Sequence, residues 1–98
     1  MFTAGQVTIQ NGTLINANQE YKITLPQYYK KISIQARQYA PVKFSFVENE
    51  SGTNYMTLKP GVSYWEDNIR HVGDLYVQTP TPGTIVEVLT WYGGDNDR

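Results

Sequence analysis

The chain has no cysteine, and only 17% of its 98 residues are charged. Without cysteine there is neither a disulfide framework nor a thiolate metal site, so packing and hydrogen bonds must hold the fold. The single histidine, His71, has no nucleophile pattern around it that would make it a catalytic base. Glu66 and Asp67 are neighbours on an expected strand, so their carboxylates point to opposite faces. These absences predict a protein that is not an enzyme and uses no metal or cofactor.

Long apolar runs and a strong charge of one sign are missing as well. No stretch approaches the ~20 apolar residues of a membrane helix, and the first residues, Met-Phe-Thr-Ala-Gly-Gln, do not resemble a secretion signal. The net charge of −1 argues against nucleic acid as the main partner. We therefore expect a protein made in the cytoplasm that binds neither membranes nor nucleic acid.

Residues 31–46 show what the chain does contain, an alternation of apolar and polar side chains. The apolar positions are Ile32, Ile34 and Ala36, then Val42, Phe44 and Phe46. A period of two is typical of strands with one buried and one exposed face. We expect a ribbon of two strands here, broken at Ala40-Pro41. No segment of the chain has a sustained period of 3.6, so helices are not expected.

Further short strands are expected at spacings of about 8–12 residues, which is typical of a sandwich or small barrel. The other candidates are residues 21–25, 55–58, 62–69, 75–79 and 84–92. The predicted fold class is all-β, a single antiparallel β-sandwich of seven to nine short strands, of which a jelly roll is one form. The strand at 84–92 is apolar on both sides, so it should be central in a sheet or covered by another subunit.

The sandwich should span residues 19–92, with different segments on either side of it. Asn11-Gly12 is a pair favoured in two-residue hairpin turns, so residues 1–18 are expected to form a hairpin or a loose arm. Residues 93–98 are expected to be a disordered tail.

The candidate contact residues are basic and aromatic. Within the ribbon, the outward set Lys31, Arg37 and Lys43 carries only positive charge. Tyr64-Trp65 and Trp91-Tyr92 are neighbouring pairs on strands, so one ring of each pair should face inward and the other outward. Such rings can be core residues, anchors of a protein interface or platforms for sugars, and spacing does not decide which.

Charge is also unevenly distributed along the chain. Residues 1–47 hold five basic and one acidic side chain (+4), and residues 48–98 hold three basic and eight acidic ones (−5). The distribution is either ordinary scatter or a dipole that would favour packing against copies or an acidic partner.

From residue 19 to residue 92 the order of segments resembles that of a known group of proteins. The segments are Leu25-Pro26, Lys31 to Arg37, Pro41 to Phe46, Leu58 to Ile69 with its Pro-Gly turn, Asp74 to Thr79, and Thr84 to Tyr92. This order is similar to that of the small β-sandwich accessory proteins of tailed bacteriophage virions, which include head-decoration, head-fibre and tail-associated proteins.

The resemblance implies a non-enzymatic role in the virion, where the protein would bind the capsid or tail lattice. It also implies a symmetric homo-oligomer, with a trimer favoured. The alternative is a carbohydrate-binding module or receptor-binding domain that recognises cell-surface glycans. The two differ in partner: a protein lattice in the first case, a sugar ring stacked on exposed aromatics in the second.

Overall fold

The computed structural model describes residues 6–26, 29–67 and 73–92. These ranges contain eight strands, which confirms the all-β class and the expected number of strands. Within them, no helix is long and apolar enough to cross a membrane.

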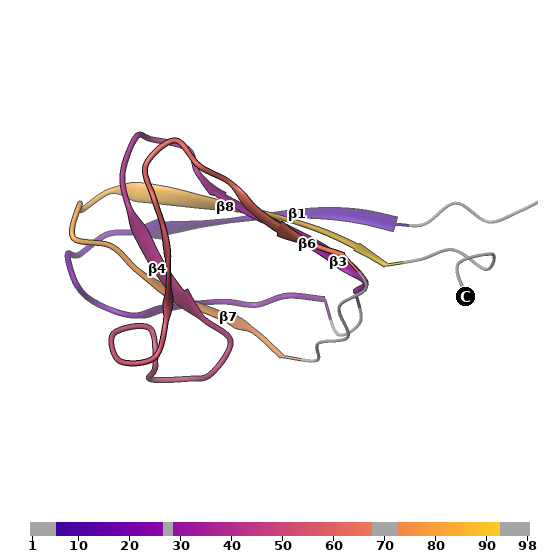
Figure 1. Cartoon of the computed structure of the whole chain (residues 1–98), viewed down its shortest axis with the longest axis horizontal. Coiled ribbons are helices and arrows are strands. Elements are labelled where there is room, and N and C mark those ends of the chain that lie inside the picture. Colours follow the sequence, from indigo (N-terminus) through magenta and orange to yellow (C-terminus); the bar gives the residue numbers. More distant parts are fainter. Residues whose placement is uncertain (1–5, 27–28, 68–72, 93–98) are drawn as a thin grey trace, which may run out of the picture.

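The strands form two antiparallel sheets of four that pack face to face as two layers (Figure 1). In chain order they are β1 (Gln6–Leu14), β2 (Tyr21–Ile23), β3 (Lys31–Ala36), β4 (Val42–Ser45), β5 (Met56–Leu58), β6 (Tyr64–Glu66), β7 (Leu75–Gln78) and β8 (Thr84–Tyr92). The first sheet has the order β1-β8-β3-β6 and the second has the order β2-β7-β4-β5. The β-sandwich prediction is therefore correct.

The pairing pattern is that of a jelly roll. β1 pairs with β8, β2 with β7, β3 with β6 and β4 with β5, so the chain is one long hairpin folded back on itself. Pairing of β3 with β8 and of β4 with β7 then rolls this hairpin into two sheets. Successive strands mostly switch between sheets, and residues from both halves of the chain alternate in each layer.

The core lies between the two sheets and is built from the inward side of each alternation. Its fully or almost fully buried side chains include Leu14, Ile32, Ile34, Val42, Phe44, Leu58, Leu75, Val77, Val86 and Val88. Burying each such side chain stabilises the fold by roughly 1.5–3 kcal/mol relative to leaving it in water. Strands from both sheets contribute to this core.

The loop between β4 and β5 is held by a single carboxylate from elsewhere in the chain. Glu20, next to β2, accepts hydrogen bonds from the backbone N–H groups of Asn49 (2.7 Å) and Ser51 (3.0 Å) and from the Ser51 hydroxyl (2.5 Å). Gln78 Nε2 donates to the same hydroxyl oxygen at 3.1 Å. Ser51 is fully buried, so this polar loop is an ordered part of the structure.

The expected hairpin at Asn11-Gly12 is wrong, and so is the loose arm over this part of the chain. Residues 6–14 form one uninterrupted strand that pairs residue by residue with β8. Gly12 serves close packing: a Cβ atom added there would lie 2.9 Å from Ile23 Cγ1. A glycine inside a strand commonly marks such a close approach.

The expected two-stranded ribbon at 31–46 is also wrong, although both of its strands exist. β3 and β4 belong to different sheets and do not pair with each other. The chain crosses from one layer to the other between them, where Thr79 Oγ1 donates a hydrogen bond to the Pro41 carbonyl at 2.7 Å.

Two other local predictions are confirmed, the strand at 84–92 and the turn at Pro60-Gly61. The strand at 84–92 has the expected bounds and is central, between β1 and β3. The Pro60-Gly61 turn is confirmed, with Gly61 at φ 78° and Val62 N donating to Lys59 O at 3.1 Å. The strand expected at 62–69 is shorter, and the predicted tail at 93–98 lies outside the described residues.

Candidate interaction face

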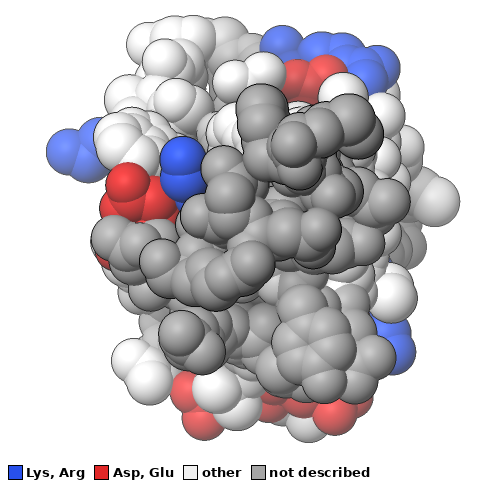
Figure 2. Space-filling view, turned by 90° about the vertical axis from the view of Figure 1, so that its right-hand side faces the viewer, with Lys and Arg blue, Asp and Glu red and all other residues white. Residues whose placement is uncertain are grey.

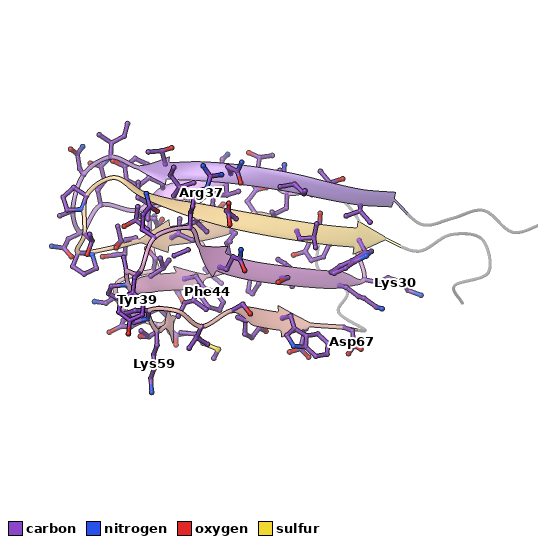
Figure 3. The ribbon with its side chains drawn as sticks, turned by 90° about the horizontal axis from the view of Figure 1, so that it is seen from above. Lys30, Arg37, Tyr39, Phe44, Lys59 and Asp67 are labelled. Carbon is purple, nitrogen blue, oxygen red and sulfur yellow. The ribbon has the colours of Figure 1, made fainter. Side chains whose placement is uncertain are left out.

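The outer face of the first sheet carries the largest group of exposed apolar side chains on regular structure. Register places its members on one side of four neighbouring strands. We call this surface the outer face; it consists of Val7 and Ile9 on β1, Ile85, Glu87, Leu89 and Trp91 on β8, Lys31, Ser33 and Gln35 on β3, and Trp65 on β6. Figure 3 views the first sheet from this side.

Two cross-strand rows make one end of the outer face apolar. In the first row Val7 lies opposite Trp91, and the row ends at Lys31. In the next row Ile9 lies opposite Leu89, and the row continues through Ser33 to Trp65. Val7 is 53% exposed, Ile9 69% and Trp65 65%. Exposed apolar side chains that adjoin across strands, rather than being scattered singly, mark interaction surfaces in soluble proteins.

The other end of the outer face is polar. Glu87 accepts hydrogen bonds from Gln35 Nε2 and from Arg37 Nε, both at 2.8 Å. The hydrogen bonds from Gln35 and Arg37 hold the pKa of Glu87 below its ordinary value, so it is a carboxylate at neutral pH. The guanidinium of Arg37 is therefore matched by a charge within the molecule.

The three basic candidates do not share a surface, which corrects the prediction of one outward basic set. Lys31 is the first residue of β3, and Arg37 follows its last residue. Figure 3 shows Arg37 far from Lys30, the residue before β3. Lys43 lies on β4, in the other sheet. Its Nζ sits 4.8 Å from the ring centroid of Tyr55, while Lys31 Nζ sits 5.9 Å from that of Trp91.

In the first aromatic pair, Tyr64-Trp65, one ring faces inward and the other outward, as predicted. Tyr64 turns inward and packs on the core, with its ring centroid 5.2 Å from that of Phe44, whereas Trp65 points outward. Trp91 belongs to the outer face and is partly covered. Tyr92 ends β8, and its side chain lies outside the described residues, as does His71.

Sequence reasoning missed Val7 and Ile9 as members of the face. They alternate with Thr8 and Gln10 as strand residues do, but the Asn11-Gly12 pair that follows favours a turn. A more useful signal is the apolar second side of residues 84–92, which predicts a strand that is central in a sheet or covered by another subunit.

The charged side chains of the described residues form no single patch at the end of the molecule that Figure 2 shows. At the end of the molecule seen in Figure 2, basic and acidic side chains of the described residues appear in several separate places. On the outer face itself, Lys31 and Glu87 carry opposite charges, so the apolar rows, and not a field of one sign, set this face apart.

Comparison with known proteins assigns the chain to no family. No family model and no curated protein matches the chain. Among solved structures, it is similar to the solution NMR structure of a de novo designed double-stranded β-helix. The two share 20% sequence identity with a TM-score of 0.49, and the match covers 91% of this chain and 99% of that one.

Proposed function

We propose that the protein is a non-enzymatic accessory protein of a tailed bacteriophage virion and that it binds the capsid or tail lattice through the outer face. The observation that carries this proposal is the pair of apolar rows, in which Val7, Ile9 and Trp65 are more than half exposed. Jelly rolls are common as viral capsid domains and as lectin domains. The fold therefore fits lattice binding and glycan binding equally well.

The proposed contact works by burial of apolar surface around an aromatic anchor. Trp65 is the most exposed ring of the outer face, and tryptophans of this kind dominate interface energetics when a partner covers them. On a lattice, neighbouring sites present one another at high effective concentration, so weak single contacts add up. In this proposal, little of the binding free energy comes from the basic residues Lys31, Arg37 and Lys43.

Counting copies of the protein on particles tests the proposal. Particles are sedimented through a density gradient from lysates of the organism that encodes the chain, and the protein is quantified by mass spectrometry. We expect a fixed number of copies per particle. Trp65→Ser should lower occupancy at least about 10-fold at limiting protein, as for an interface hot spot.

Tyr39→Ser is the matched control, because Tyr39 is 84% exposed and lies in the connection between β3 and β4, away from the outer face. It should bind normally. A chain that never sediments with particles, or a Trp65→Ser variant that binds as well as Tyr39→Ser, contradicts the proposal.

The second candidate, glycan recognition, rests on Trp65 and Trp91 lying on the same face. They belong to β6 and β8, two strands apart, which corresponds to about 10 Å across the sheet. They are also offset by two residues along the strands, because Trp65 lies in the row of Leu89. The polar Gln35–Glu87 pair lies on the same surface and could bond hydroxyl groups. Titration calorimetry with the ligands found on a glycan array, for the protein and Trp65→Ser, distinguishes this candidate from lattice binding.

A further inference from the structure

The four strands at the sheet edges differ greatly in length. β2, β5 and β6 have three residues each, whereas β1 has nine. A long edge strand offers a row of unpaired backbone groups to any other chain, and short edges are one way of avoiding this. Only β1 is long enough to be a template for an added strand.

β1 also lacks the other features that protect edges. Its sequence, Gln-Val-Thr-Ile-Gln-Asn-Gly-Thr-Leu, contains no charged residue and no proline. Its register with β8 advances one residue at a time over the whole length, so there is no bulge. Lysine, proline and bulges are the usual protections, and β2 and β6 each carry a charge, at Lys22 and Glu66.

Hydrogen bonds identify the backbone groups that face the open edge. Leu14 O accepts from Gly83 N at 2.7 Å, so Leu14 turns its polar groups toward β8. On the other side, Lys30 N donates to Trp91 O at 2.7 Å and Arg37 N to Ile85 O at 2.8 Å, so the odd residues of β8 face β3. The even residues of β8 therefore face β1, where their partners are the even residues of that strand.

Since backbone direction alternates along a strand, the odd residues of β1 turn both N–H and C=O to the open edge. These residues are Val7, Ile9, Asn11 and Thr13. Throughout the described part of the chain, none of them makes a backbone hydrogen bond across that edge. Figure 3 shows β1 as the outermost strand of the sheet.

We infer that two copies of the protein pair through this edge, β1 against β1 in antiparallel orientation, around a two-fold axis at Gln10. This register pairs all of residues 6–14 and joins edge-facing residues to each other, Val7 with Thr13 and Ile9 with Asn11. Because β1 is uncharged, self-pairing brings no like charges together. The first sheets of the two copies then join into one sheet of eight strands, and the outer faces of both copies lie on the same side of it.

Gln10 gives independent support for the position of the axis. Its Nε2 donates to Thr24 O, just beyond β2, so the side-chain amide lies on the edge side of the sandwich. Its Oε1 is buried and has no hydrogen-bond partner among the described residues, and buried polar atoms usually have one. At the axis, two Gln10 residues face each other at a Cα separation of about 4.5 Å. Because Oε1 is shielded within a single copy, the side chain must turn toward the open edge before Oε1 can accept from the other amide.

This two-fold contact differs from the trimer that the phage resemblance implied. An edge that pairs with its own copy is isologous and closes at two subunits, whereas a closed trimer needs two different surfaces in contact.

Light scattering after size-exclusion chromatography measures the oligomeric state of the purified protein, and the measurement is repeated over a range of protein concentrations. We expect a dimer. Ile9→Lys should raise the dissociation constant at least 10-fold, because a lysine on the edge opposes strand addition. Ile15→Lys is the matched control: Ile15 is 65% exposed, just beyond the end of β1, and its variant should dimerise normally.

Ile9→Pro tests the backbone itself. It removes an N–H that points to the open edge and leaves the ladder with β8 intact, so it should give a folded monomer. Circular dichroism checks that this variant folds; if it does not, Ile9→Lys decides the outcome.

Amide hydrogen exchange separates edge pairing from stacking of the outer faces. In the dimer, the amides of Val7, Ile9, Asn11 and Thr13 should become protected, while those of Thr8, Gln10, Gly12 and Leu14 are protected in monomer and dimer alike. A protein that stays monomeric at NMR concentrations, a trimer, or a dimer with unprotected odd amides overturns the inference. None of these measurements uses particles, so lattice binding is tested separately.

Discussion

At the scale of single residues, Glu20 shows how one carboxylate can order a polar loop. Burial disfavours its charge, but the hydrogen bonds from Ser51 and Asn49 outweigh this and lower the pKa of Glu20 below the ordinary 4.5. Hydrogen bonds to a charged acceptor contribute more than those between neutral groups. The loop sequence, Glu-Asn-Glu-Ser-Gly-Thr-Asn, looks like unstructured chain, but Glu20, the Gln78 side chain and backbone hydrogen bonds within the loop hold it in place.

Because the folded-state pKa of Glu20 is lowered, its stabilising contribution is fully present above pH 4.5 and is lost as the pH falls through the lowered value. Glu20→Gln should reduce the free energy of unfolding at pH 7 by about 1–2 kcal/mol. Urea unfolding at pH 7 and pH 3 measures the difference, which should shrink at pH 3.

Glu48→Gln is the control, since it removes the same charge from an exposed position in the same loop. If the difference in the free energy of unfolding between the parent protein and Glu20→Gln does not change with pH, the carboxylate is not the group that orders the loop.

At the scale of the elements, β1 is positioned by contact with β2 as well as by its ladder to β8. Gly12 lies against Ile23, which is almost fully buried. This contact brings the edge of one sheet close to the edge of the other. It explains why the asparagine–glycine pair, a frequent turn signal, lies in the middle of a strand here.

Gly12→Ala should therefore destabilise the protein by about 1–3 kcal/mol, because the new methyl group would overlap Ile23 Cγ1 in a packed site. Asn11→Ala, one residue earlier and exposed, should change stability by less than about 0.5 kcal/mol. Thermal unfolding of the two variants beside the parent protein measures both effects. Equal stability of the two variants would mean that the contact with Ile23 does not restrict position 12.

At the scale of the whole molecule, the jelly roll mixes the two halves of the chain. Strands from the basic first half and the acidic second half alternate in both sheets, as in β1-β8-β3-β6. A charge asymmetry along the sequence therefore does not become two charged ends of the molecule. Arg37 and Glu87, one from each half, form an ion pair at 2.8 Å.

It follows that binding through the outer face should depend little on salt. Between ~0.05 and ~0.5 M NaCl, where the screening length of exposed charges falls severalfold, particle occupancy at limiting protein should change less than about threefold. Sedimentation across a salt series tests this. A steep loss of binding would instead indicate that Lys31, Arg37 and Lys43 drive the contact.

Much of the local structure could be predicted, and the candidate face only in part. The inward set Ile32/Ile34 follows from alternation, and the turn at Gly61 follows from its need for positive φ. Residues 84–92 are apolar on both sides, so alternation does not show that Val86 and Val88 face the core. The outer face did not follow, because its rows join β1, β8, β3 and β6, which are distant in sequence. The single basic surface failed for the same reason: β3 and β4 are consecutive but lie in different sheets.

The sequence by itself determined that the chain forms strands without disulfides, which side chains of residues 31–46 face the core, and that residues 84–92 are apolar on both sides. These properties depend on the period of two and on composition, which act over a few residues. The tertiary structure alone decided that Val7 stands beside Trp91 and Ile9 beside Leu89, and that β1 is an open edge. Strand pairing is a contact between distant segments, and alternation is the same whichever strand lies next to it.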